Sequence, residues 1–154
     1  LAKALADPFC QGNCADEDYY CLGKIYADRG DTDKAIRCYT KALEIPAVRG
    51  RAYIELSLLY KRRGRWADAK KLWHEMDERG IETSFALVEL AKHYEHLAKD
   101  YDKAMHCTQR AIELALKRKV FSGDMINISD LAQLNKRRER IERKQKQNKG
   151  ENVS

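Results

Sequence analysis

The sequence predicts an all-α protein in which three helical hairpins stack as an α-solenoid and a further helix caps the C-terminal end. The first observation is a recurrence every 34 residues: Leu22, Tyr26, Gly30 and Ala35 return as Leu56, Tyr60, Gly64 and Ala69, and then Leu90 and Tyr94 follow. A period of this length is typical of stacked helical hairpins. The second observation is that 154 residues contain only two prolines and eight glycines, which favours helices joined by short turns.

The first repeat is predicted over residues 16–46, with helices at 17–29 and 33–45. Before it, residues 1–15 are expected to hold the end of an upstream helix, which stops at Asp7 and Pro8, and a linker. In the first helix, three apolar side chains and the aliphatic part of an arginine recur at helical spacing. They belong to Leu22, Ile25, Tyr26 and Arg29. Gly30 is expected to end this helix in a left-handed conformation, and Asp31 or Thr32 to cap the next.

The second and third repeats are predicted over residues 50–80 and 84–119. Their helices are expected at 51–63, 67–79, 84–98 and 101–119, with Gly64 and Gly80 at helix ends and Thr83 or Ser84 as the cap of the fifth helix. The third repeat departs from the pattern. Its turn, Leu97–Asp100, has no glycine. The turn contains one extra residue, because Ala69 and Ala104 are 35 residues apart instead of 34. Thr108 occupies a position where an aromatic residue is expected.

Small and large residues alternate between the paired helices. Gly23, Ser57 and Ala91 occupy one equivalent position of the first helices, and we expect the second helices to cross closely there through Ala35, Ala69 and Ala104. The bulky residues that are expected to fill the space between hairpins are Tyr26, Tyr39, Tyr60, Trp73 and Tyr94.

Residues 120–147 are predicted to form the capping helix, since the open end of a repeat stack exposes apolar surface. Leu131, Leu134 and Ile141 supply its apolar positions. Its second half is strongly basic and is expected to fray into solvent, and residues 148–154 are expected to be a disordered tail.

These patterns resemble the tetratricopeptide repeat, whose units read W-x2-L-G-x2-Y, then A-x3-F, then proline. In the first unit, Tyr19 stands for the tryptophan, Tyr39 for the phenylalanine, and Pro46 closes the unit. The resemblance extends from Asp16 to Lys117.

Longer stretches resemble the C-terminal region of bacterial ribonuclease H-like proteins of the YprB type. They are LAKALADP, LLYKRRGRWADAKKLWHEM and ALVELAKHYEHLAKDYDKAMHCTQRAIEL. In that family an exonuclease-like domain precedes a short helical array. The resemblance implies an accessory domain of a ribonuclease H-like nuclease, with the nuclease carboxylates upstream of Leu1.

Candidate chemical sites are sparse, and we expect no catalysis, cofactor or metal. His93 and His96 lie one helical turn apart and His106 precedes Cys107, but zinc needs three or four convergent ligands. Cys10 and Cys14 have the wrong spacing for a zinc ribbon, so we expect free thiols. Adjacent residues of a helix point in different directions, which argues against a Cys107–His106 dyad. There is no G-x-S-x-G, Walker or G-x-G-x-x-G motif.

The inner face of the array is the main candidate for binding. In tetratricopeptide arrays the first helix of each hairpin lines a concave groove, and the resemblance transfers this role to Tyr20, Lys24, Ile54, Leu58, Lys61, Arg62, Phe85, Val88, Lys92 and His96. Apolar side chains ringed by cations suit a peptide with apolar anchors and some acidic groups. The asparagines of the carboxylate-clamp subclass are absent from this face. The alternative is that Ile54 and Phe85 belong to the core between repeats.

The basic tail is the second candidate. Residues 1–135 hold 22 Lys and Arg against 21 Asp and Glu, whereas residues 136–149 hold eight against two. Such a cluster binds nucleic-acid phosphates at low salt, here through Lys136, Arg137, Arg138, Arg140, Arg143 and Lys144. Aromatic residues that would stack on bases are absent there. The alternative is a solvated helix end.

The expected partner is therefore a protein or peptide, or the chain's own upstream domain, with nucleic acid as the alternative. No apolar run approaches the roughly 20 residues that span a bilayer, so no membrane partner is expected. Five cysteines at irregular spacing favour a reducing, cytoplasmic location.

Overall fold

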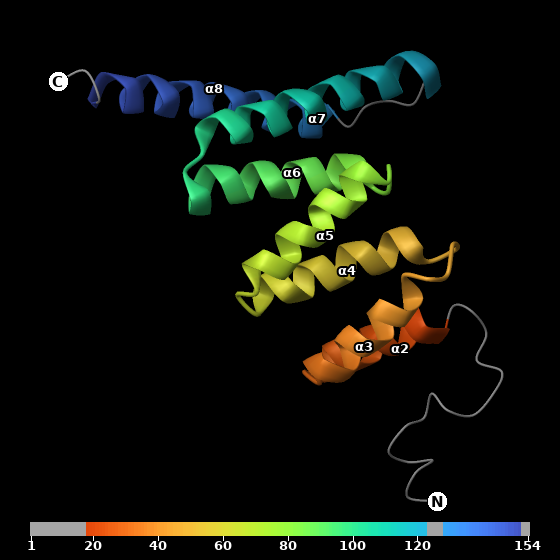
Figure 1. Ribbon diagram of the computed structural model, residues 1–154. Coiled ribbons are helices and arrows are strands. Elements are labelled where there is room, and N and C mark those ends of the chain that lie inside the picture. Colours follow the sequence, from red (N-terminus) through yellow and green to blue (C-terminus); the bar gives the residue numbers. More distant parts are fainter. Residues whose placement is uncertain (1–17, 123–127, 152–154) are drawn as a thin grey trace, which may run out of the picture. The chain divides into compact units, whose positions relative to one another are not determined.

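The computed structural model describes residues 18–122 and 128–151, and all the regular elements in these residues are helices (Figure 1). In chain order they are α2 (Asp18–Asp28), α3 (Thr32–Ala42), α4 (Arg49–Arg62), α5 (Trp66–Glu78), α6 (Thr83–His93), η1 (Tyr94–Ala98), α7 (Tyr101–Ser122) and α8 (Ile128–Glu151). The predicted all-α class is confirmed. The predictions for residues 1–15 lie outside the described residues.

Several boundaries differ from the prediction: the helix expected at 33–45 ends at Ala42, and the capping helix expected from residue 120 begins at Ile128. The helix expected at 84–98 is divided into α6 and the π-helix η1, and α7 continues beyond residue 119 to Ser122. The last helix continues past its expected end at residue 147 to Glu151. The expectation that its basic half frays was wrong, because side chains of this half are held by ion pairs that are described below.

The chain divides into two compact units, residues 1–72 and residues 73–154. In the first unit α2 packs on α3, and α3 packs on α4. The buried face of α3 follows helical spacing, with Ala35, Cys38, Tyr39 and Ala42 almost without exposed surface. On α4 the corresponding residues are Ala52, Tyr53, Leu56, Ser57 and Leu59.

Gly23 of α2 lies against the Tyr39 ring of α3. A Cβ atom added there would lie 2.6 Å from Cδ1 and from Cε1 of Tyr39, which is too close for any side chain. We expected the small residue Ala35 to meet Gly23, but the group that requires the glycine is the Tyr39 ring. The ring fits because Gly23 has no side chain.

The turns between α2 and α3 and between α4 and α5 share one hydrogen-bond pattern. The backbone N–H of Asp31 donates to the Tyr26 carbonyl at 2.9 Å, and that of Arg65 donates to the Tyr60 carbonyl at 2.9 Å. This is the Schellman closure, which needs a left-handed residue just before the donor. Gly30 and Gly64 supply it with φ of 78° and 70°, as predicted. Asp31 also caps α3 by accepting from the Lys34 backbone N–H.

The turn of the third repeat, which joins η1 to α7, accommodates its extra residue in the π-helix η1. Here the N–H of Asp100 donates to the Tyr94 carbonyl, so this closure spans one residue more than at Tyr26 and Tyr60. A π-helix is the local structure that absorbs one inserted residue within a helix. Lys99, with φ of 53°, takes the left-handed position that glycine holds in the other turns.

In the second unit α6 packs on α7, and α8 packs on α7, beside which it lies over part of its length in Figure 1. Leu134 and Ile141 of α8 are buried, as a capping helix requires. Thr108, at the position expected to be aromatic, is fully buried, and its hydroxyl donates to the Ala104 carbonyl at 2.8 Å.

One predicted cap was wrong. Glu82 precedes α6 with φ of 45° and makes no side-chain capping hydrogen bond, and Thr83 is already the first helical residue. The left-handed step at Glu82 starts the helix one residue before Ser84 and leaves neither hydroxyl at the cap position.

Candidate functional site

The predicted groove residues of the first unit lie on two neighbouring helices. Tyr20 and Lys24 are one turn apart on α2, and α4 carries the four others, Ile54, Leu58, Lys61 and Arg62. The Arg51 guanidinium, which precedes Ile54 by three residues, lies 4.9 Å from the centroid of the Tyr20 ring. This cation–π contact places the Tyr20 side of α2 beside the Ile54 side of α4. We call these six residues the α2–α4 face.

The apolar residues of the α2–α4 face keep part of their surface accessible. Ile54 and Leu58 are half-buried, while their neighbours Leu56 and Ser57 are buried. Lys24 and Arg62 are exposed and Lys61 is half-buried. The face therefore combines accessible aliphatic carbon with positive charge, which is the chemistry expected for an apolar anchor flanked by acidic groups.

The predicted residues of the second unit lie on α6 and η1. Phe85 and Val88 are half-buried, and His96 is exposed. Lys92 is engaged within the unit, because its ammonium donates to the carboxylate of Glu89, a side chain with 5% of its surface exposed. The residues predicted to bind a partner are thus located in both units, and each set is described within its own unit.

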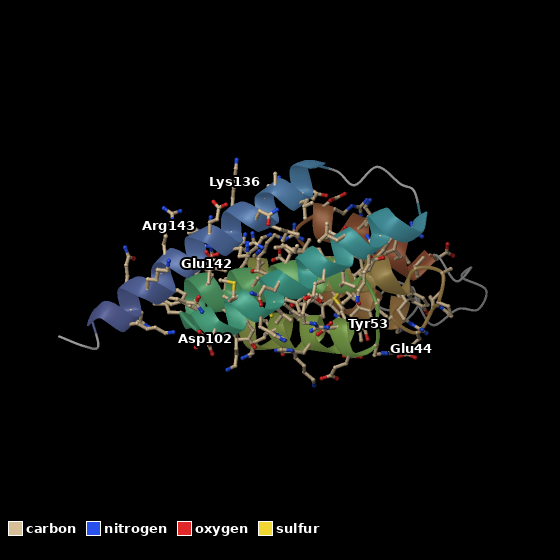
Figure 2. The ribbon with its side chains drawn as sticks, turned by 90° about the horizontal axis from the view of Figure 1, so that it is seen from above. Glu44, Tyr53, Asp102, Lys136, Glu142 and Arg143 are labelled. Carbon is tan, nitrogen blue, oxygen red and sulfur yellow. The ribbon has the colours of Figure 1, made fainter. Side chains whose placement is uncertain are left out.

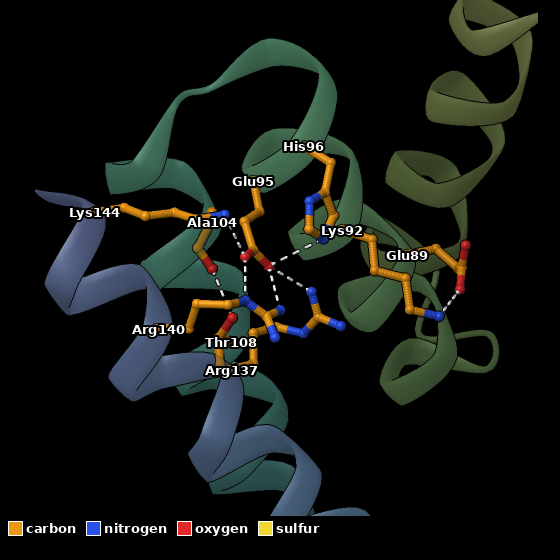
Figure 3. Close-up of polar contacts among 9 residues, drawn as sticks. All are labelled: Glu89, Lys92, Glu95, His96, Ala104, Thr108, Arg137, Arg140 and Lys144. Carbon is orange, nitrogen blue, oxygen red and sulfur yellow. Dashed lines mark hydrogen bonds and ion pairs between the residues drawn. The ribbon is translucent and has the colours of Figure 1, made fainter. Parts of the chain in front are cut away.

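The basic residues of the tail all lie on α8, but the structure separates them into two groups. Arg137, Arg140 and Lys144 converge on the carboxylate of Glu95 in η1, as Figure 3 shows. Arg137 Nη1 lies 2.7 Å from Oε2, Arg140 Nη2 lies 2.8 Å from Oε2, and Lys144 Nζ lies 2.9 Å from Oε1. Arg140 Nε adds a second bond, to Oε1, so that this guanidinium binds in bidentate fashion.

Glu95 is the most strongly perturbed acid of the unit. Its side chain has no exposed surface, and His96 Nε2 lies 3.5 Å from its Oε2. Burial alone would raise the pKa of this carboxyl, but the hydrogen bonds from Arg140 and Lys144 outweigh it and lower the pKa from 4.5 to about 2. We refer to Glu95, His96, Arg137, Arg140 and Lys144 as the Glu95 cluster.

The sequence of α8 explains why these cations face inward. Arg137, Arg140 and Lys144 recur at spacings of three and four residues on the side of the helix that also buries Leu134 and Ile141. Gln145 extends this side by donating to Asp102 of α7 at 2.7 Å. We predicted α8 as a cap but missed Glu95 as its partner. The available signal was that the cations share the period of the two apolar residues.

The other tail cations are directed differently. Figure 2 shows Lys136 and Arg143 pointing outward from α8, and both are exposed. Glu139 and Glu142 are exposed on the same helix, and Arg138 is half-buried. The six residues predicted to bind nucleic acid therefore do not form one uniform cationic surface.

The described cysteines and histidines include the adjacent pair His106 and Cys107. Cys107 is 7% exposed whereas His106 is exposed, so the two adjacent side chains lie in different environments. Burial raises the pKa of the Cys107 thiol, which disfavours the reactive thiolate. Among the residues that the structure describes, no group of three potential metal ligands was found. Cys10 and Cys14 lie outside them.

None of the helices within the described ranges combines the length and the apolar character needed to cross a membrane.

Comparison with known proteins identifies the repeat. The family model described as "Tetratricopeptide repeat" matches residues 17–45. The resemblance to the tetratricopeptide repeat is confirmed. The matched segment contains α2, its Schellman turn and α3 with the Gly23–Tyr39 contact. Tetratricopeptide repeats generally mediate protein–protein interactions, which directs attention to the surface of these helices.

One curated protein is also similar. "Uncharacterized protein YprB" of Bacillus subtilis (strain 168) is 29% identical over 96 residues, which are 60% of this chain. The match covers 23% of that protein, so the chain corresponds to less than a quarter of its length.

Proposed function

We propose that this chain is a non-catalytic protein-interaction module that holds a segment of a partner protein on the first helices of its hairpins. The proposal is supported by the α2–α4 face, on which Ile54 and Leu58 are half-buried and Lys24 and Arg62 are exposed. Accessible aliphatic side chains that are positioned by a rigid helix act as anchoring sites for peptides.

The partner context follows from the resemblance to the YprB-type proteins. We propose that the module is the C-terminal accessory domain of a bacterial, cytoplasmic ribonuclease H-like protein and serves there as a scaffold. The similarity to part of YprB supports a relationship to that protein only. Under this proposal the held segment belongs either to another protein or to the chain's own upstream domain.

Nucleic-acid binding through the tail is the weaker alternative. Arg137, Arg140 and Lys144 each pair with Glu95, and Glu139 and Glu142 lie among the remaining cations. Phosphate binding depends on accessible positive charge, and carboxylates on the same surface oppose it. No observation favours this alternative over the protein-interaction module.

The proposal is tested with peptides selected on the complete chain from a random displayed library. A selected peptide is labelled, and its affinity is measured by fluorescence anisotropy. We expect Leu58→Asp, and separately Lys61→Glu with Arg62→Glu, to weaken binding by about tenfold or more, as anchor residues do.

Matched variants control for charge and for surface apolarity. Arg37→Glu with Lys71→Glu makes the same charge change on exposed positions of α3 and α5, and Leu116→Asp replaces a leucine on α7 that is 45% exposed. These controls should leave the affinity unchanged. A peptide that loses affinity equally with both sets of variants, or with neither, would show that the α2–α4 face is not the binding surface.

A further inference from the structure

The Glu95 cluster contains more positive charge than its carboxylate requires. One carboxylate receives four hydrogen bonds from Arg137, Arg140 and Lys144, and the exposed His96 lies beside it. A buried carboxylate needs partners, but a single bidentate arginine satisfies both of its oxygens. Three cations around one anion leave two positive charges in excess.

The excess charge is accessible to solvent. Arg140 retains 40% of its side-chain surface, Lys144 retains 30% and His96 retains 54%. A guanidinium has five N–H donors and an ammonium has three, so the bonds to Glu95 use only part of this capacity. The cluster therefore presents hydrogen-bond donors and net positive charge on its open side.

Three other carboxylates of the second unit have partners of their own. Asp102 accepts from Gln145, Asp100 pairs with Lys103 at 2.9 Å, and Glu89 pairs with Lys92. Figure 3 shows the Lys92–Glu89 pair apart from the group that surrounds Glu95. The excess charge of the cluster thus remains after these local ion pairs are considered.

The cluster also lies at the end of the predicted binding stripe of the second unit. Val88, Lys92 and His96 follow one another at four-residue intervals along α6 and η1, and His96 belongs to the cluster. A peptide that ran along this stripe would reach Arg140 and Lys144 at the C-terminal end of η1.

We propose that the Glu95 cluster anchors a carboxylate of an acidic peptide segment through Arg140, Lys144 and His96. The inference rests on the proposed function and specifies the chemistry of the partner. The anchor is built by the capping helix α8 together with the π-helix. Glu95 competes with the incoming carboxylate for the same donors and holds the two arginines in place.

A peptide carboxylate fits this site better than a nucleic-acid backbone does. The accessible donors converge on one point, whereas a phosphodiester chain spreads its charge along a line and is bound by a row of cations. Such a row on the outer side of α8 would contain Glu139 and Glu142, which are exposed. A compact cationic site matches a single acidic side chain or a terminal carboxylate.

The test measures anisotropy of a fluorescein-labelled oligoglutamate peptide with the complete chain at low salt, and oligoglutamine serves as the uncharged control. Lys144→Gln should weaken oligoglutamate binding about two- to fivefold, the effect of one partly exposed charge pair, and His96→Gln, which removes a hydrogen-bonding imidazole, should weaken it less. Arg143→Gln, on the exposed side of the same helix, should leave it unchanged. Circular dichroism establishes that each variant is folded.

Glu95→Gln should change the affinity for oligoglutamate in the opposite direction. Because it removes the competing carboxylate and keeps the shape of the side chain, oligoglutamate should bind about three- to tenfold more tightly. A merely structural role for the cluster predicts no gain. If this variant unfolds, Lys144→Gln and His96→Gln, which retain the pairing of Glu95 with both arginines, still decide the question.

Two outcomes would overturn the inference. One is equal weakening by Lys144→Gln and Arg143→Gln, which would indicate only general attraction of charge. The other is tighter binding of an oligothymidylate of equal charge, which would favour nucleic acid. Failure here is separable from failure of the proposed function: library peptides that lose affinity with Leu58→Asp but not with Lys144→Gln would leave the interaction module intact and remove only the carboxylate anchor.

Discussion

At the scale of single residues, Glu95 shows what a buried charge contributes when it is fully paired. Its pKa is lowered to about 2 in the folded chain, against an ordinary value of 4.5. A depressed acid pKa stabilises the fold at pH values above the unfolded pKa, and this stabilisation is lost as the pH falls toward the folded pKa. The free energy linked to Glu95 is therefore present at neutral pH and disappears between about pH 4.5 and pH 2.

We predict that Glu95→Gln lowers the free energy of unfolding by about 3 kcal/mol at neutral pH, as the size of the pKa shift implies. The same variant should show a weaker dependence of stability on pH below 4.5, since the titrating group is gone. Urea unfolding followed by circular dichroism at several pH values measures both effects. Glu139→Gln, at an exposed position of α8, is the matched control. Identical pH profiles for Glu95→Gln and the native chain would contradict the assignment.

Gly23 and Glu95 also show where inference from sequence reaches its limit at this scale. The small residue at position 23 predicted a close crossing, and the crossing exists, but the sequence does not reveal which group comes close. Ala35 and Tyr39 both lie on the buried face of α3, and only the three-dimensional arrangement directs the Tyr39 ring at Gly23. Glu95 was missed for a similar reason, because its partners are more than 40 residues away in the sequence.

At the scale of the helices, much was predictable because local signals and the repeat agree. Gly30 and Gly64 occur where a left-handed residue ends a helix, and Asp31 occurs where α3 needs a cap. The third turn has no glycine, so its local signal was weak. The chain accommodates the extra residue by forming η1 and by placing Lys99 in the left-handed region.

Lys99 yields a prediction about this turn. A non-glycine residue with φ of 53° carries a conformational cost that glycine avoids. Lys99→Gly should therefore raise the free energy of unfolding by about 0.5–1 kcal/mol, despite the greater freedom of glycine in the unfolded chain. Thermal and urea unfolding measure the change.

The matched control is Lys71→Gly, at an exposed position in the middle of α5, which should lower the free energy of unfolding by about 1 kcal/mol. If the two substitutions destabilise the chain to the same extent, the left-handed conformation at Lys99 is not the source of the cost.

The capping helix α8 illustrates a different limit. Leu131, Leu134 and Ile141 were sufficient to predict that it covers the end of the array, but the net positive charge of residues 136–149 suggested a solvated or phosphate-binding end. The cations that recur with the apolar positions pair with Glu95, whereas Lys136 and Arg143 on the outer side point away from the helix into solvent. Charge content alone does not distinguish these two groups.

At the scale of the whole molecule, function follows from the surfaces that the repeat exposes. Among the residues that the repeat pattern makes recurrent, Leu56 and Ala69 are buried and Gly64 closes a turn. The residues that vary between units, including Tyr20, Ile54 and Phe85, are those that we assign to partner binding. The repeat therefore predicts the architecture well, whereas the identity of the partner depends on side chains that the period does not constrain.

Amide hydrogen exchange of the complete chain, with and without a library-selected peptide, tests the central claim most directly. The account predicts slower exchange in α2, α4 and α6, the first helices of the hairpins, and unchanged exchange in α3, α5 and the first turns of α7. Slower exchange confined to α3, α5 and α7, with α2, α4 and α6 unaffected, would contradict it.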